Sequence, residues 1–375
     1  MSAIADIRVR PVSFRMPRPW VPTAPDMHLV LVEVLDTEGA AGTGFSWTPT
    51  IGVSAVAALL RDDIRSFALG RDTDPRELWP QLWVHLHEAG GGGITTIALA
   101  GLDLALWDLA ARREGTGVAG LIGRRHQSLP LYGSGVNLHY ADDELRAQAR
   151  RWADVGYPAA KAKVGHADPA EDLRRMRLIR DELGADRRLM IDANQRWSLD
   201  DAERALGVLG ELDPAWIEEP LRADDLAGYR ELRRRTDLPI AMGENLHTVH
   251  RFREAIDAGV DVLQPNVVRV GGITPFLEIA AECAAAGVTL APHLLPDLSA
   301  QVAVALNTEV WIEDVEDAWL SDLGALAEPG PVRRDAERVT VDDRPGLGLN
   351  WRAATPVMNH SDPRTSPLSS IGAEQ

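Results

Sequence analysis

Three acidic residues end strand-like apolar runs, and they are evenly spaced along the chain. They are Asp192, Glu218 and Glu244, separated by two equal steps of 26 residues (192 to 218 and 218 to 244). Parallel strands of a barrel recur at such intervals, so these carboxylates are expected to meet where the strands end. Carboxylates that close together need a cation, and oxygen ligands favour Mg²⁺ over Zn²⁺. The spacing therefore predicts a magnesium site, although acidic residues also end strands as helix N-caps or solvated loop residues.

Two lysines end another predicted strand, in the segment from Pro158 to Gly165. Lys161 and Lys163 lie on the same side of that strand because side chains alternate with a period of two. Beside a bound cation, Lys161 would add positive charge at a substrate carboxylate. Lys163, desolvated and next to a cation, is expected to have a lowered pKa and to act as a base. The alternative is a pair of solvated charges on an edge strand.

Two further strand ends carry groups that can exchange protons. The run from Thr289 ends at His293, which we expect at the same mouth as an acid or a second base. Glu313 follows twenty residues later and, if protonated, would donate a hydrogen bond to an enediolate oxygen. A structural role for His293 remains the alternative.

From about Leu129 the sequence alternates short apolar runs with helical stretches, which is typical of parallel strands joined by crossover helices. One helix is expected to start at Asp168-Pro169 and end at Gly184, and another to start at Thr274-Pro275 and end at Gly287. The predicted class is α/β, with a (β/α)-barrel (a modified TIM barrel) over residues 126–320. Eight strands are expected to begin near Leu129, Pro158, Leu189, Ala215, Ile240, Val260, Val288 and Glu309.

Residues 1–125 predict a separate N-terminal α+β domain. Strands are expected at Ile4–Phe14 and Leu29–Leu35, and helices at Val53–Leu69, Pro75–His87 and Ile94–Ala111. A proline-rich loop with Trp20 at its centre joins the two strands, and it is either a lid or an inert surface loop. Residues 321–375 are expected to form a C-terminal segment that returns towards this domain and ends in a polar tail.

Composition narrows the class of protein. The net charge of −17 disfavours nucleic acid and anionic membrane surfaces as partners. Cys283 is the only cysteine, and the first residues lack a leader-like pattern, so a reduced, cytoplasmic enzyme is expected. No apolar run of membrane-spanning length is expected.

Across nearly its whole length the chain resembles the mandelate racemase subgroup of the enolase superfamily. The resemblance implies that Asp192, Glu218 and Glu244 bind Mg²⁺, with Glu218 preferred over Glu219, and that Lys163 is the base. It further implies that Lys161 binds the substrate carboxylate, Asn194 contacts substrate and Glu313 donates to the enediolate. The motifs that carry it are Lys161–Lys163, Asp192–Gln195, Ile217–Pro220, Met242–Asn245, Val270–Ile273 and Ala291–His293.

The N-terminal domain resembles the capping domain of this family. Its two loops, near Arg15 to His28 and Phe45 to Ile51, are then expected to close the site and choose the substrate. Family resemblance also suggests a symmetric homo-oligomer. The residues predicted to contact a small carboxylate substrate from these loops are Arg15, Arg18, Trp20, His28 and Trp47.

One residue departs from the family pattern. The subgroup pairs its histidine with an aspartate at the end of the sixth strand, where this chain has Asn266. Without an anionic partner His293 should be a poorer base, which argues against two-base racemisation. We expect the Asn266 amide to accept a hydrogen bond from the ring and so hold its tautomer.

Three functions follow from these residues. The first is a Mg²⁺-dependent acid-sugar dehydratase: Lys163 removes the α-proton, an enediolate forms, and His293 assists loss of the β-hydroxyl to give a 2-keto-3-deoxy sugar acid. The second is a racemase or epimerase of a 2-hydroxy acid. The third is a regulator that binds metal and an acid without turnover.

Overall fold

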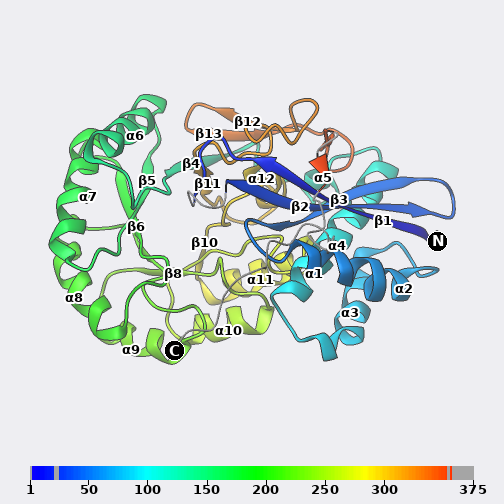
Figure 1. The fold of residues 1–375 in the computed structure, drawn as a ribbon, viewed down its shortest axis with the longest axis horizontal. Helices are drawn as coiled ribbons and strands as arrows, with labels where there is room; N and C mark the ends of the chain where they lie inside the picture. The colour runs from blue at the N-terminus through cyan, green and yellow to red at the C-terminus, as the bar shows by residue number, and fades with distance from the viewer. Residues whose placement is uncertain (1, 21–24, 353–354, 357–375) are drawn as a thin grey trace, which may run out of the picture.

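The computed structural model describes residues 2–20, 25–352 and 355–356, and it divides into a capping domain and a barrel (Figure 1). The capping domain opens with three antiparallel strands, β1 (Ile4–Arg15), β2 (Asp26–Asp36) and β3 (Ala41–Thr48). Strand β14 (Thr355–Pro356) adds to the free edge of β1, so the end of the described chain lies on the capping sheet.

Strand β3 was absent from the sequence prediction, which treated its second half as a loop. Its glycines explain both the omission and the strand. A Cβ on Gly42 or Gly44 would lie within 2.6 Å of helix α4 (Ile94–Arg113), so only glycine lets that helix pack directly on the sheet. Glycine lowers strand propensity, but here it permits the close approach.

The capping helices follow the predicted segments with small differences. The first is one continuous stretch made of α1 (Val53–Leu59), a π-helical turn (Leu60–Ile64) and α2 (Arg65–Ala68). Helix α3 (Pro75–His85) begins at the predicted proline, with Asp74 as its N-cap, and a 3₁₀ turn (His87–Ala89) follows. Helix α5 (Val118–Ile122) leads into the barrel.

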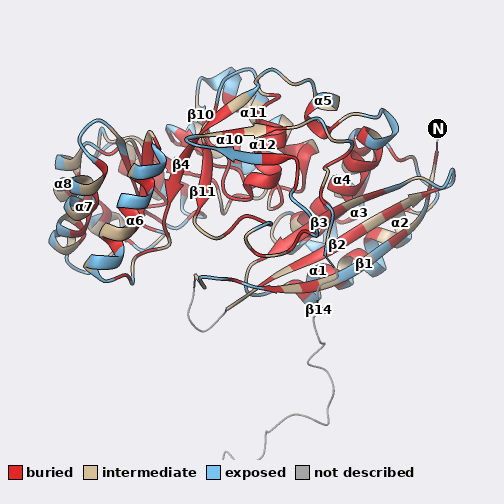
Figure 2. Cartoon of the chain, turned by 90° about the horizontal axis from the view of Figure 1, so that it is seen from above, coloured by how far each residue is buried: buried red, intermediate tan, exposed pale blue. Residues whose placement is uncertain are grey.

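Helix α4 corrects one expectation, because it is long and apolar enough to cross a membrane. In its most apolar window, 83% lies inside the molecule, and Figure 2 shows it as a mostly red, buried helix. The core helix of a globular protein satisfies the same criteria of length and composition. Here α4 packs against β2 and β3 and also against helix α11 (Ile273–Ala286) of the barrel.

All eight predicted barrel strands are present and parallel to their barrel neighbours. They are β4 (Ser128–Ser134), β5 (Ala159–Lys163), β6 (Arg188–Asp192), β7 (Ile217–Glu218), β8 (Ile240–Met242), β9 (Val262–Leu263), β10 (Thr289–Leu290) and β11 (Ile312–Val315). Pairing runs in chain order from β4 to β10, and β11 returns to pair with β4. Within the described residues, the ring lacks ladder pairing only between β10 and β11.

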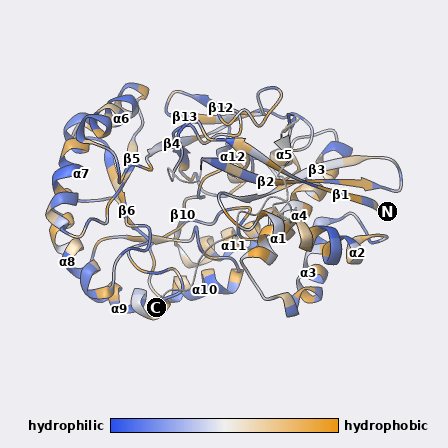
Figure 3. Cartoon of the chain, in the orientation of Figure 1, coloured by the Kyte–Doolittle hydropathy of each residue, from blue (hydrophilic) through white to orange (hydrophobic). Residues whose placement is uncertain are grey.

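The crossover helices surround this ring and mix hydrophilic and hydrophobic residues (Figure 3). Asp168 caps α7 (Pro169–Leu183) through the Ala170 N–H, as predicted, whereas α11 starts one residue before the predicted Thr274. Asp103 of α4 accepts hydrogen bonds from the Thr274 N–H and hydroxyl, which joins the two domains. The helices are α6 (Asp142–Val155), α7 (Pro169–Leu183), α8 (Leu199–Leu209), α9 (Leu226–Arg233), α10 (Val249–Asp257), α11 (Ile273–Ala286) and α12 (Pro296–Ala303).

After the barrel, a hairpin of β12 (Val332–Asp335) and β13 (Arg338–Val341) pairs with the first half of β4. The barrel interior holds the aromatic rings of Tyr132 and Trp216, which meet edge to face at 5.8 Å, and small alanines. None of the predicted catalytic or metal-binding residues belongs to this cluster; they lie towards the carboxyl ends of the strands.

Candidate active site

Strand register brings the predicted residues side by side. Lys163 pairs in register with Asp192 across β5 and β6, and Asp192 pairs with Glu218 across β6 and β7. Glu244 follows β8 by two residues, and Glu313 lies on β11 next to β4. The mouth therefore gathers carboxylates from three neighbouring strand ends and from the closing strand, with Lys163 on the strand beside them.

Lys161 is buried among these carboxylates, with only 1% of its surface exposed. Its Nζ lies 2.6 Å from Glu218 Oε2 and 2.7 Å from Glu313 Oε1, above the ring of Tyr132. Burial works to lower the pKa of Lys161, but these carboxylates outweigh it and hold the pKa well above its usual range. Lys161 is thus a fixed positive charge.

Lys163 is held by a carboxylate of the proposed metal site. Burial works to lower its pKa, yet the contact between its Nζ and Asp192 prevails, and the pKa lies above the ordinary lysine value. The lowered pKa was predicted for Lys163 beside a bound cation, and it stays a prediction. The Lys163 amine would become a base only when Asp192 has another cationic partner.

Glu313 is predicted to donate a hydrogen bond only if it is protonated. Burial works to raise its pKa, but Lys161 and hydrogen bonds lower it to about 2. It accepts from the Ser134 hydroxyl at 2.8 Å and from the Leu294 N–H at 2.9 Å. Glu313 therefore accepts hydrogen bonds in this structure, and its predicted role as a donor to an enediolate oxygen stays a prediction.

His293 and Asn266 are neighbours, but their hydrogen bond runs opposite to the prediction. The Asn266 oxygen accepts from the Val268 and Arg269 N–H groups, so its amide nitrogen faces the ring and donates to His293 Nδ1 at 3.1 Å. The ring hydrogen then lies on Nε2, which is 2.8 Å from Glu244. An aspartate would instead accept from Nδ1–H.

The three predicted ligands each have a cationic or imidazole partner in this structure. Across residues 2–20, 25–352 and 355–356, no three His, Cys, Asp or Glu side chains are arranged so as to hold a metal ion. The contacts are Asp192 with Lys163, Glu218 with Lys161 and Glu244 with His293.

The donor set nevertheless fits a hard divalent cation. Glu218 is buried, and its Oε1 has no hydrogen-bond partner among the described residues. Burial and nearby carboxylates raise its pKa to about 7, and they raise that of Glu219 well above the usual range. Crowded anions of this kind are what a divalent cation neutralises.

Sequence reasoning missed the side chains that orient these carboxylates. Gln264 donates to Glu218 at 2.6 Å, and Asn245 donates to Glu219 at 2.8 and 3.0 Å. Both are amides in strand-end motifs, which was the available signal. Asn194 has a positive φ of 44°, is exposed at the mouth, and its N–H donates to Asp192 at 2.8 Å.

The capping-domain predictions separate into two groups. Trp20 meets Trp47 edge to face at 6.3 Å, and Arg18 reaches Tyr140 and Glu316 on the barrel. Arg18 and Trp20 also line a small cavity whose wall includes the last residues of β4 and β11. This part of the proline-rich loop therefore covers the barrel mouth; residues 21–24 of the loop lie outside the described residues.

Arg15 and His28 bind within the capping sheet instead. The Arg15 side chain is 71% exposed and pairs with Asp26, and His28 Nδ1 lies 2.8 Å from the Ser13 hydroxyl. Neither contacts the acidic group in this structure.

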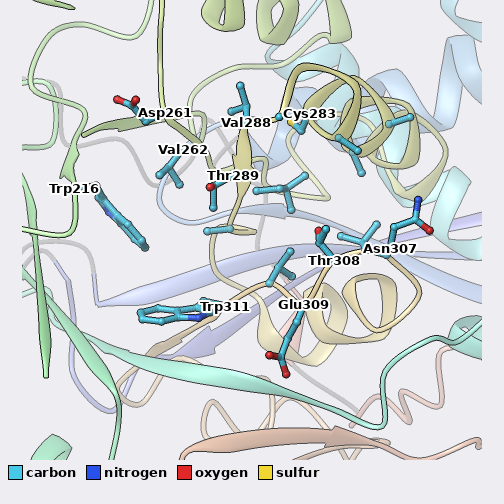
Figure 4. Close-up of a pocket in the computed structure, with 18 of the residues that line it drawn as sticks. Trp216, Asp261, Val262, Cys283, Val288, Thr289, Asn307, Thr308, Glu309 and Trp311 are labelled. Atoms are coloured by element: carbon cyan, nitrogen blue, oxygen red, sulfur yellow. The ribbon is translucent and has the colours of Figure 1, made fainter. Parts of the chain in front are cut away.

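A cavity of about 830 Å³ lies at the opposite end of the barrel, where the strands begin (Figure 4). It occupies the gap between β10 and β11, with Trp216, Thr289 and Trp311 in its walls. None of the predicted site residues lines it, and its acids Asp261 and Glu309 are paired with arginines. Its size alone does not make it the catalytic centre.

Family comparisons agree with this geometry. Residues 144–355 match the "Enolase C-terminal domain-like" family model, and residues 6–123 match the "Mandelate racemase / muconate lactonizing enzyme, N-terminal domain" model. The chain belongs to the mandelate racemase subgroup of the enolase superfamily. The recognised family and the modified TIM barrel fold are thereby confirmed.

Two relatives illustrate the reactions found in the family. The chain is 37% identical to a 3,6-anhydro-alpha-L-galactonate cycloisomerase of Streptomyces coelicolor, over 91% of this chain and 96% of the relative. It is 33% identical to the L-talarate/galactarate dehydratase of Salmonella typhimurium, over 86% and 80%.

Solved structures of relatives contain magnesium. The L-talarate dehydratase of Polaromonas, complexed with Mg and L-glucarate, has a TM-score of 0.84 and 34% identity over 94% of this chain and 96% of its own. A racemase from Streptomyces coelicolor with bound magnesium has a TM-score of 0.86 and 34% identity over 93% and 97%. The prediction of Mg²⁺ is thus confirmed at the level of the family.

Proposed function

We propose that this protein is a Mg²⁺-dependent lyase that removes the α-proton of an acid sugar and expels the oxygen on its β-carbon. The observation that carries this proposal is the juxtaposition of Lys163 with Asp192 at the barrel mouth. Asp192, Glu218 and Glu244 are the proposed ligands. A bound Mg²⁺ would neutralise negative charge that develops on the substrate carboxylate.

Lys163 acquires its role from its partner. While Asp192 faces Lys163, the ammonium form is favoured, as the raised pKa indicates. When Asp192 serves as a metal ligand, that stabilisation is lost and burial dominates, which lowers the pKa towards that of a general base. Lys161 remains charged and is placed to hold the substrate carboxylate and the enediolate.

His293 is proposed to assist the departing oxygen. Its Nε2–H points to the mouth because the Asn266 amide donates to Nδ1. A hydrogen bond from Nε2–H would stabilise negative charge on the leaving oxygen. The same arrangement leaves Nε2 without a free lone pair, which weighs against His293 as the second base of a racemase.

The leaving oxygen distinguishes two related activities. Loss of a hydroxyl gives a 2-keto-3-deoxy acid and water, as in a dehydratase. If the oxygen belongs to an ether ring, the ring opens and the product is an isomer of the substrate; the cycloisomerase relative motivates this second candidate.

The test is a panel of aldonic, aldaric and anhydroaldonic acids, incubated with protein and Mg²⁺ and assayed for 2-keto product. A product lighter than substrate by one water supports the dehydratase, and a product of equal mass supports the cycloisomerase. Absence of keto product throughout, with solvent deuterium entering both configurations of a 2-hydroxy acid, would support the racemase instead. Ligand binding with no α-proton exchange in D₂O would support the regulator.

A further inference from the structure

Arg269 lies between the capping domain and the end of the barrel that carries the proposed metal ligands. It follows β9 in the turn that begins at Asn266, and it is half-buried. Its Nη1 donates to the Glu244 carbonyl at 2.9 Å and to Asn245 Oδ1 at 2.5 Å. Both acceptors belong to the strand-end motif that supplies a proposed ligand.

Asn245 carries the contact onward to the carboxylates. Its amide nitrogen donates to both oxygens of Glu219 and, at 2.9 Å, to Glu244 Oε1. Since its Oδ1 is occupied by Arg269, the orientation of this amide is fixed by that guanidinium. Removing Arg269 would free Asn245 to rotate and loosen two acidic side chains.

The other face of Arg269 meets the capping domain. Its guanidinium carbon lies 5.4 Å from the centre of the Trp47 ring, within the range of a cation–π contact. Trp47 is 1% exposed and packs against Trp20 of the proline-rich loop. It lies near the end of β3, just before residues 49–51. One guanidinium thus contacts both a predicted substrate-facing tryptophan and a proposed ligand's backbone.

We propose that Arg269 is a positioning residue that couples Trp47 of the capping domain to the proposed magnesium site. It holds Glu244 and Asn245 in place when Trp47 packs against it, so that the packing of Trp47 and the affinity for the cation support each other. The inference rests on the proposed magnesium-dependent function. The Arg269 backbone N–H donates to Asn266 Oδ1 at 3.1 Å, so Arg269 also lies beside the residue that orients His293.

Isothermal titration of the metal-free full-length protein with Mg²⁺ tests the coupling. Arg269→Ala is expected to weaken Mg²⁺ affinity about 10- to 100-fold, the usual effect of losing a residue that orients metal ligands. Trp47→Leu is expected to weaken it about three-fold through loss of the cation–π contact. In the double variant, Trp47→Leu should have no additional effect, because its influence passes through Arg269.

Two conservative variants and one control keep the test informative. Arg269→Lys retains the charge but not the planar fork, so it should recover only part of the affinity, and Trp47→Phe should recover most of it. Arg188→Ala removes a comparable guanidinium, 5.7 Å from Trp311 at the far end of the barrel, and should leave Mg²⁺ affinity unchanged. Circular dichroism would identify variants that fail to fold, in which case Arg269→Lys and Trp47→Phe carry the comparison.

Unchanged affinity in folded Arg269→Ala, or effects of the two single variants that multiply in the double variant, would overturn the coupling while leaving the proposed function standing. If wild-type protein binds no Mg²⁺, the proposed function fails and the coupling fails with it.

Discussion

Lys161 and Lys163 are the only two lysines in a chain with 39 lysine and arginine residues. Arginine keeps its proton under all conditions relevant to catalysis, whereas the lysine pKa shifts readily with its surroundings. The chain therefore has side-chain amines only where the proposed chemistry needs one. This also makes the two groups individually observable.

Lysine labelled with ¹³C at Cε should give two side-chain signals whose titration can be followed by NMR. In metal-free protein the Lys163 pKa is expected above the ordinary value because Asp192 stabilises its charge. Saturating Mg²⁺ should lower it, while Lys161 stays charged. A Lys163 pKa that does not change on adding Mg²⁺ would contradict the proposed activation.

Lys163→Ala is expected to reduce turnover of any acid-sugar substrate about 10²- to 10⁴-fold, the usual contribution of a general acid or base. Because the side chain is not a proposed metal ligand, Mg²⁺ binding should survive. Activity and calorimetric titration on the same preparation check both points. Retained exchange of the substrate α-proton in D₂O would show that another group is the base.

Asn266→Asp is expected to give His293 the aspartate partner that is typical of the subgroup. A carboxylate would accept from protonated Nδ1, favour the imidazolium and free Nε2 to act as a base when the ring is neutral. The variant should then gain α-proton exchange in the configuration that wild type leaves untouched, measured by NMR in D₂O. Adding His293→Asn should abolish the gain; an unchanged exchange pattern would refute the role given to Asn266.

At the residue scale, the sequence was informative about types and spacing but not about orientation. Strand periodicity placed Lys163, Asp192 and Glu218 at one level, and register confirms it. Which atom of Asn266 faces His293 depends on two backbone N–H groups in the following turn, which no spacing rule reveals. The protonation of Glu313 likewise depends on Lys161 and Ser134, its neighbours from other strands.

At the scale of elements, strong hydrophobic patterns and end signals were predictive. Asp168 and Gly184 bound α7 as expected, and each barrel strand lies near its predicted start. Strand β3 was missed because its glycines are required by close packing against helix α4, which lies about sixty residues away in sequence. Tertiary packing overrides local propensity at such positions.

Gly44→Ala tests that explanation. A Cβ at residue 44 would lie 2.4 Å from the Ala105 nitrogen and 2.5 Å from the Gly101 oxygen, so α4 must move away from the sheet. We expect a loss of about 1–3 kcal/mol in the free energy of unfolding, measured with urea. The matched control is Gly207→Ala at an exposed position of α8, where nothing lies within 4 Å of the added Cβ and alanine should stabilise by about 1 kcal/mol. Equal effects at both sites would refute a specific close approach.

At the scale of the whole molecule, the two-part architecture was predictable because composition and periodicity change near residue 125. The contacts between the parts were not, since they join residues far apart in the chain. Arg18 with Glu316, Thr274 with Asp103 and Arg269 with Trp47 are examples. These contacts place the capping loops over the mouth, and they are where substrate choice is expected to reside.

The acidic interior predicts how stability varies with pH. Burial raises the pKa of Glu218 and Asp103 to about 7 and that of Asp297 to about 6. Between the ordinary carboxyl value of about 4 and these values, the folded protein binds more protons than the unfolded chain. The stability that these groups contribute is present at low pH and is lost as pH rises towards 7, with Glu218 accounting for about 3 kcal/mol at most.

Metal-free protein should therefore have a lower unfolding temperature at pH 8 than at pH 5.5, measured by scanning calorimetry. Mg²⁺ competes with the proton on Glu218, so saturating Mg²⁺ should raise the unfolding temperature more at pH 8, and chelation should reverse the increase. Asp103→Asn, remote from the proposed ligands, should reduce the pH dependence without changing the increment produced by Mg²⁺. If metal-free protein is equally stable at both pH values, the carboxylates at the mouth are not crowded enough to require a cation.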